Sequence, residues 1–168
     1  MKDIYAQILA RHAADVIKTT CALDSVDIMI ETNPKELPLC EWSVRIDFQG
    51  SLASNGQEKL KGYVICGALL RDDALPLIAA IARYFGLDDS FLLLPNGPAD
   101  LLSEFLNIII GLTGAGWAEQ GFEMEFSTPH NLGQLPDAPM GNSGQTFYIG
   151  LTANNSAKVE ILVVFEDN

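Results

Sequence analysis

The stretch Asp100-Leu-Leu-Ser-Glu104-Phe-Leu-Asn107-Ile-Ile-Ile-Gly111-Leu-Thr-Gly114 decides how this sequence is interpreted. Its Leu, Ile and Phe residues would cover most of the surface of a helix. The other positions recur three or four residues apart, which places them on one helix face. We call this face the stripe, and it consists of Asp100, Glu104, Asn107, Gly111 and Gly114. The stretch therefore predicts a largely buried helix with one face of different chemistry.

The stripe has a simple explanation and a functional one. A buried helix leaves one edge in water where polar residues collect, and a Glu-x-x-Asn spacing alone is a weak motif. However, Asn is a poor helix former, and a glycine inside a helix costs about 1 kcal/mol relative to Ala. Gly114 could mark a fraying helix end, but Gly111 could not if the helix continues to Trp117. These costs favour a contact surface, from which Glu104 and Asn107 could reach a partner together.

Composition narrows the class of protein. The chain has 168 residues, 48% of them hydrophobic and 19% charged, which is typical of a single folded domain spanning residues 1–168. The net charge of -12 argues against a nucleic-acid partner and against binding to an anionic membrane. No uninterrupted apolar run approaches the roughly 18 residues that span a bilayer, and the amphipathic N-terminus lacks the apolar block of a signal peptide. The 3 cysteines have no metal-like spacing, so we expect reduced thiols in a cytoplasmic protein.

The remaining patterns predict an α+β fold, with a mostly antiparallel sheet of about six strands packed against long helices. The helices are expected over Asp3 to about Thr20, from Asp72 or Asp73 to Tyr84, and from Asn96-Gly-Pro to near Gln120. The strands are expected at Asp27–Glu31, Glu41–Phe48, Lys61–Gly67, Phe122–Phe126, Gln145–Thr152 and Lys158–Phe165. A turn near Ala53-Ser-Asn-Gly-Gln and a loop over residues 131–145 separate strands. Leu87–Leu94 reads either as a short strand or as a packed connector.

The histidines, Cys66 and the tryptophans do not predict a further functional site. His12 and His130 lack neighbours that would complete a metal-ligand set, so we expect structural or surface histidines and no metal centre. Cys66 lies in an apolar strand and is expected in the core. Trp42 and Trp117 are expected to anchor the core or an interface.

The order of these elements and one set of residues resemble the CheX branch of the CheC/CheX/FliY phosphatase family of bacterial chemotaxis. The family's hallmark is an acidic residue and an Asn three apart on a long helix, a Gly four residues after the Asn, then a strand that ends at a Pro with a Gly soon after. Here these are Glu104, Asn107, Gly111, Pro129 and Gly133. The sequence departs from the family at the two residues after the helix Gly, where Leu-Thr replaces the frequent Asn-Ala. A single Glu-x-x-Asn pair favours CheX over CheC, which typically has two.

The resemblance implies a phosphatase for the aspartyl phosphate of a CheY-like response regulator. The phosphorylated regulator would then be the partner, and the required Mg²⁺ would belong to the regulator, with no cofactor in this chain. Asn107 would orient the attacking water, because a carboxamide donates and accepts without adding charge beside a phosphoryl group. Glu104 would pair with the regulator's phosphate-site Lys. Asp100, Gly111 and Gly114 would contact the docked partner.

Two other interpretations stay open. The chain could be a non-catalytic module that binds a signalling or flagellar-switch partner through the same helix face. It could also be an oligomerising structural domain whose stripe is an internal contact. The resemblance to CheX further implies a homodimer joined across a sheet edge, and the apolar strand Lys158–Phe165 is our candidate for that edge.

Overall fold

The computed structural model describes residues 2–35, 40–53, 59–68, 71–133, 144–153 and 157–167. In chain order, its elements are α1 (Lys2–Cys21), β1 (Val26–Thr32), β2 (Trp42–Leu52), β3 (Lys59–Ala68), α2 (Arg71–Tyr84), the 3-10 helix η1 (Asp89–Leu93), α3 (Gly97–Glu119), β4 (Phe122–Phe126), β5 (His130–Gly133), β6 (Gly144–Ala153) and β7 (Ala157–Glu166). The predicted α+β class is confirmed. The expected turn after Ala53 and most of the expected 131–145 loop lie outside the described residues.

All strands belong to one antiparallel sheet, with the order β1-β6-β7-β3-β2-β4. Among the described residues the sheet has 7 strands rather than about six, because β5 also pairs with β2 and uses residues that were expected in a loop. β4 and β5 share the same edge of β2, and the break between them includes Pro129, which has no N–H to donate. Ser127 bridges this break, because its backbone N–H donates to Asp47 O over 2.9 Å.

The prediction that Lys158–Phe165 forms an edge of the sheet is wrong. β7 lies inside the sheet, between β6 and β3. Its side chains are buried on both faces, with Val163 in the main core and Val164 in a smaller apolar cluster on the opposite face. A strand buried on both faces reads as a continuous apolar run, which explains its weakly charged sequence. The true edges are β1 on one side and β4 with β5 on the other.

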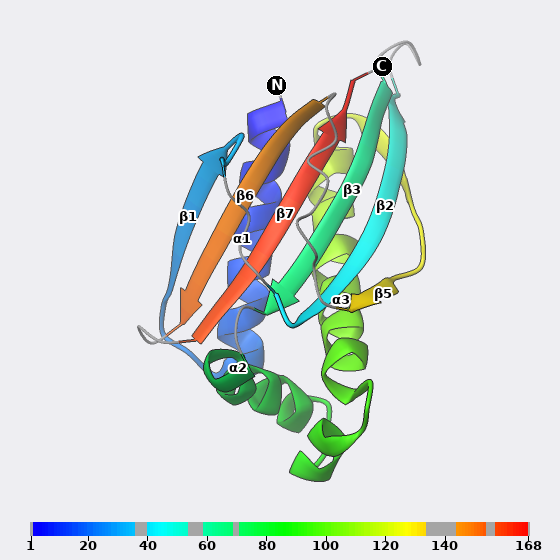
Figure 1. Cartoon of the computed structure of the whole chain (residues 1–168). Coiled ribbons are helices and arrows are strands. Elements are labelled where there is room, and N and C mark those ends of the chain that lie inside the picture. Colours follow the sequence, from blue (N-terminus) through cyan, green and yellow to red (C-terminus); the bar gives the residue numbers. More distant parts are fainter. Residues whose placement is uncertain are drawn as a thin grey trace.

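The helices cover one face of the sheet. Figure 1 shows α1 and α3 running side by side behind the strands, while α2 crosses the end of this layer. The core between the layers is rich in aromatic rings, and Trp117 of α3 is fully buried in it. Its ring lies 5.1 Å from Phe48 of β2, and its Nε1 donates to the backbone oxygen of Tyr5 over 3.1 Å. Truncating such a residue typically costs 3–5 kcal/mol, so this cluster fixes α3 against both the sheet and α1.

The ambiguous segment Leu87–Leu94 is a connector and not a strand. It contains η1, whose preceding residue Asp88 caps it by accepting a hydrogen bond from the Ser90 backbone N–H over 2.8 Å. α3 begins directly afterwards, with Pro98 in its first turn as expected. It ends at Glu119, before Gly121, whose positive φ of +90° suits glycine and turns the chain into β4.

Candidate functional site

The exposed face of α3 carries the stripe that the sequence predicts. Glu104 and Asn107 are exposed, whereas Phe105 and Leu106 between them are completely buried. Asp100 and Gly111 are exposed as well. The prediction that Glu104 and Asn107 are accessible on one helix face is therefore confirmed.

The two stripe glycines have different surroundings. A Cβ added at Gly111 would meet nothing within 4 Å, so the backbone there is open to close approach from outside. A Cβ added at Gly114 would lie 2.8 Å from Cε2 of Phe126, a residue of β4. Gly114 thus lets the Phe126 ring pack directly on α3. The argument that a small residue admits a partner therefore applies to Gly111 and no longer to Gly114.

The side chains of Glu104 and Asn107 are available to a partner. Among the described residues, neither makes a hydrogen bond or an ion pair within the chain. The neighbouring Ser103 is different, because its hydroxyl donates to Ala99 O over 2.9 Å on the helix itself. A carboxylate and a carboxamide therefore stand one helical turn apart on a helix held rigidly by its buried face.

The second half of the motif lies on the neighbouring strand. β5 contacts α3, and Gly133 closes this strand with a positive φ of +71°. Its N–H donates to Asn131 Oδ1 over 2.7 Å, and its carbonyl oxygen accepts from the Ser43 hydroxyl over 2.8 Å. A residue with a side chain would be strained at this φ. Pro129 therefore lies in the break before β5, and Gly133 ends this strand beside α3.

The two departures from the family pattern point in different directions. Thr113 is fully buried on the core side of α3, so it cannot touch a docked partner. Leu112 is 46% exposed and borders the stripe next to Gly111. The change at Leu112 therefore alters the candidate surface, whereas the change at Thr113 alters only the core.

The histidines and cysteines have no role at the stripe. Within the described residues, no group of three or more His, Cys, Asp or Glu could hold a metal ion. His12 is half-buried in a hollow between α1 and α3, and His130 is exposed on β5. Cys66 is fully buried, as expected, and all three cysteines are free thiols. Trp117 is a core anchor, and Trp42 is half-buried beside the core.

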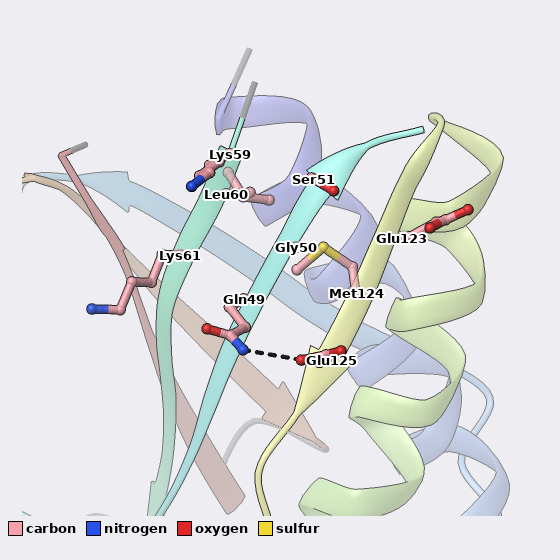
Figure 2. A pocket seen from close by; sticks show the side chains of 9 residues that line it. All are labelled: Gln49, Gly50, Ser51, Lys59, Leu60, Lys61, Glu123, Met124 and Glu125. Atoms are coloured by element: carbon pink, nitrogen blue, oxygen red, sulfur yellow. Dashed lines mark hydrogen bonds between the residues drawn. The ribbon is translucent and has the colours of Figure 1, made fainter. Parts of the chain in front are cut away.

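A shallow groove elsewhere on the molecule offers no alternative catalytic pair. Figure 2 shows it on β2, β3 and β4, with the helices behind the sheet. Gln49 Nε2 donates to Glu125 Oε2 over 3.0 Å, and Lys61 forms an ion pair of 2.9 Å with Glu166. The Met124 side chain occupies the space above Gly50. Glu125 is thus hydrogen-bonded inside the groove, Lys61 is paired with a residue beside it, and none of the lining residues belongs to the stripe.

By length and composition alone, α3 could cross a membrane. However, the apolar side chains of α3 that face the sheet and α1 are buried in the protein core. The core helix of a folded domain has the same composition, so this property does not distinguish a membrane span.

The fold is shared with solved structures. No family model and no curated protein matches the sequence. A CheC-like chemotaxis protein from Shewanella oneidensis matches with a TM-score of 0.73 and 17% identity, over 99% of this chain and 100% of that one. A chain of the CheX-CheY-BeF3-Mg complex from Borrelia burgdorferi matches with a TM-score of 0.69 and 12% identity, over 97% of this chain and 98% of that one. The FliM middle domain from H. pylori matches with a TM-score of 0.54 and 15% identity, over 94% of this chain and 85% of that one. The chain therefore has the fold of the CheC/CheX-like chemotaxis proteins.

Proposed function

We propose that this chain is a phosphatase that hydrolyses the aspartyl phosphate of a CheY-like response regulator in the cytoplasm. The observation that carries the proposal is the exposure of Glu104 and Asn107, unpaired within the described residues, on one face of a rigid core helix. The shared fold supports it, since one of the similar structures is a complex of CheX with CheY.

Asn107 would orient the attacking water. Hydrolysis of an acyl phosphate requires in-line attack on phosphorus, so a catalyst gains most by placing water opposite the leaving oxygen. A carboxamide suits this task, because it offers a donor and an acceptor and adds no negative charge beside the phosphoryl group. The Mg²⁺ that neutralises the phosphoryl oxygens would be held by the regulator.

Glu104 would set the docking register. A carboxylate beside the phosphoryl group would repel it, so Glu104 is better suited to pair with the regulator's phosphate-site Lys. Asp100 would add a further negative charge one turn earlier, and Gly111 would admit the partner's backbone one turn beyond Asn107. Gly114 is the weaker docking candidate, because the space that its missing side chain leaves is filled by the Phe126 ring.

A second copy of this chain is a further proposed partner. β1 is an edge strand whose residues are largely exposed, and these include Ile28, Met29 and Ile30. An exposed apolar edge strand is a template for pairing with another chain. We therefore assign the proposed homodimer to the β1 edge and no longer to β7.

A binding module without catalysis is the second candidate function. Two observations favour it: the fold is shared with the FliM middle domain, and Leu112 changes the exposed surface beside the stripe. Phosphate release from a panel of phosphorylated regulators separates the candidates. A phosphatase accelerates release from at least one regulator and loses this with Asn107→Ala while still binding. A binding module binds a regulator without accelerating phosphate release, and Asn107→Ala weakens that binding. In a structural domain, Asn107→Ala changes the oligomeric state instead.

A further inference from the structure

The 3-10 helix η1 lies at the N-terminal end of the stripe. Gly97 precedes Glu104 by seven residues, about two helical turns, so both lie on the same face of α3. A Cβ at Gly97 would lie only 2.0 Å from the backbone oxygen of Phe91 in η1. The face of α3 that carries Glu104 is therefore covered by η1 at its beginning and open from Asp100 onward.

Large apolar side chains are exposed on both elements that lead into this junction, η1 and the end of α2. Leu93 is 84% exposed and Leu94 is 52% exposed, at the end of η1. At the end of α2, which contacts η1, Tyr84 and Phe85 are also exposed and their rings lie 5.5 Å apart. We call these four residues the apolar shoulder. A cluster of large exposed apolar residues on a folded domain typically marks an interaction site.

We propose that the apolar shoulder is a second contact for the same response regulator that docks on the stripe. This inference rests on the proposed function and adds an anchor outside the catalytic pair. Continuity supports it, because seven residues of helix place Gly97 only about 10 Å from Glu104 along the axis, well within the footprint of one protein domain.

Charge defines the kind of surface that fits. Along the chain, exposed Asp88 and Asp89 lie between the two pairs of shoulder residues, and exposed Asp100 follows them. Among the described residues near the junction, only Arg83 at the end of α2 brings a positive charge. The matching partner surface is therefore a small apolar patch edged by Lys or Arg, which is consistent with a regulator whose phosphate-site Lys pairs with Glu104.

The shoulder can be tested with Leu93→Ser, measured as the Kd for regulators activated with beryllofluoride and Mg²⁺. We expect binding about tenfold weaker, because an apolar anchor is lost, with turnover at saturating phosphorylated regulator unchanged. Ile4→Ser is the matched control, since Ile4 is also exposed, at 42%, but lines a hollow with Glu119 and Gln120 at the opposite end of α3. Urea unfolding should show that both variants keep wild-type stability, because both side chains lie at the surface.

Each alternative result is decisive. If Leu93→Ser binds like wild type, the shoulder is not a regulator contact, while turnover by the wild-type chain would leave the proposed phosphatase intact. If the wild-type chain binds an activated regulator without accelerating hydrolysis, the phosphatase is wrong, and the Kd comparison still decides the shoulder. If Leu93→Ser instead dissociates a dimer in light scattering, the shoulder belongs to a second copy of the chain. If the wild-type chain binds none of the regulators, both proposals are overturned.

Discussion

Gly114 of α3 faces the ring of Phe126 in β4 so closely that an added Cβ would lie 2.8 Å from Cε2 of that ring. One turn earlier, Gly111 has open space where its Cβ would be. Helical spacing places both glycines on the stripe, yet one packs against β4 and the other leaves the exposed face open. This difference gives a matched pair of substitutions.

Gly114→Ala should destabilise the protein. The new methyl group would press on a ring that is itself packed beside Trp117, and overpacking of this kind typically costs about 1–3 kcal/mol, which outweighs the gain of about 1 kcal/mol from alanine inside a helix over most of that range. Urea unfolding measures this change. A variant that is as stable as wild type would show that the Phe126 ring moves aside without lowering the free energy of unfolding.

Gly111→Ala should have the opposite effect on stability. Alanine is favoured over glycine inside a helix by about 1 kcal/mol, and nothing within 4 Å opposes it. Under the proposed function the same methyl group stands between the helix and the docked regulator, so the Kd for the activated regulator should rise. Increased stability with unchanged binding would show that the partner does not approach the helix at this point.

Stability should depend on pH through Glu160 of β7. This side chain is only 5% exposed, and burial raises its pKa to about 7, although hydrogen bonding to Tyr148 and the charge of Lys158 oppose the shift. The unfolded chain loses the Glu160 proton near its ordinary pKa of 4.5, whereas the folded chain keeps it to about pH 7. The contribution of Glu160 to stability therefore falls as pH rises through this window and is constant above it.

Glu160→Gln should remove this dependence. The carboxamide cannot ionise, so the free energy of unfolding of the variant should vary less between about pH 5 and pH 8, with the largest gain over wild type at the alkaline end. Glu125→Gln provides the control, because Glu125 is exposed on β4. Parallel pH profiles for wild type and Glu160→Gln would show that Glu160 titrates normally in the folded protein.

One of the three thiols, Cys21, should react before the other two. Burial raises the pKa of the Cys40 thiol to about 12 and raises that of Cys66, which is fully buried, well above its ordinary value. Cys21 is half-buried, and its pKa is raised mainly by burial and lowered in part by Arg83. A thiol-specific reagent at mildly alkaline pH should therefore modify Cys21 first, and the other two only after denaturation. Rapid modification of Cys66 in the native protein would contradict its burial.

Local sequence patterns predicted the helices and strands well, but they could not predict which distant strands pair with each other. The 3.6-residue period located α3 and its exposed stripe, because the helix buries Phe105 and Leu106 and leaves Glu104 and Asn107 in water. The place of a strand in the sheet depends instead on partners far along the chain. β7 was predicted to be an edge because its sequence is apolar, but a strand buried on both faces in the middle of a sheet is apolar as well, and its own sequence does not show which strands flank it.

At the candidate site, too, local spacing was predictable and long-range contacts were not. Helical spacing brought Glu104 and Asn107 together, but it could not show that Gly114 faces Phe126, since that contact depends on where β4 pairs. The exposed leucines at the end of η1 were also missed. Leu93 and Leu94 read as part of an apolar run, and only the tertiary structure shows that their side chains lie at the surface.

The most direct test of the central claim is phosphate release at saturating phosphorylated regulator, compared between wild type and Asn107→Ala. Losing a water-orienting group removes an interaction made only in the transition state, so turnover should fall by about 10²–10³, by analogy with an oxyanion-hole donor, while the Kd for the activated regulator changes little. Gln7→Ala, which removes an exposed carboxamide from α1, should keep full turnover. If Asn107→Ala keeps wild-type turnover, Asn107 does not position the water, and the binding-module function replaces the phosphatase proposed here.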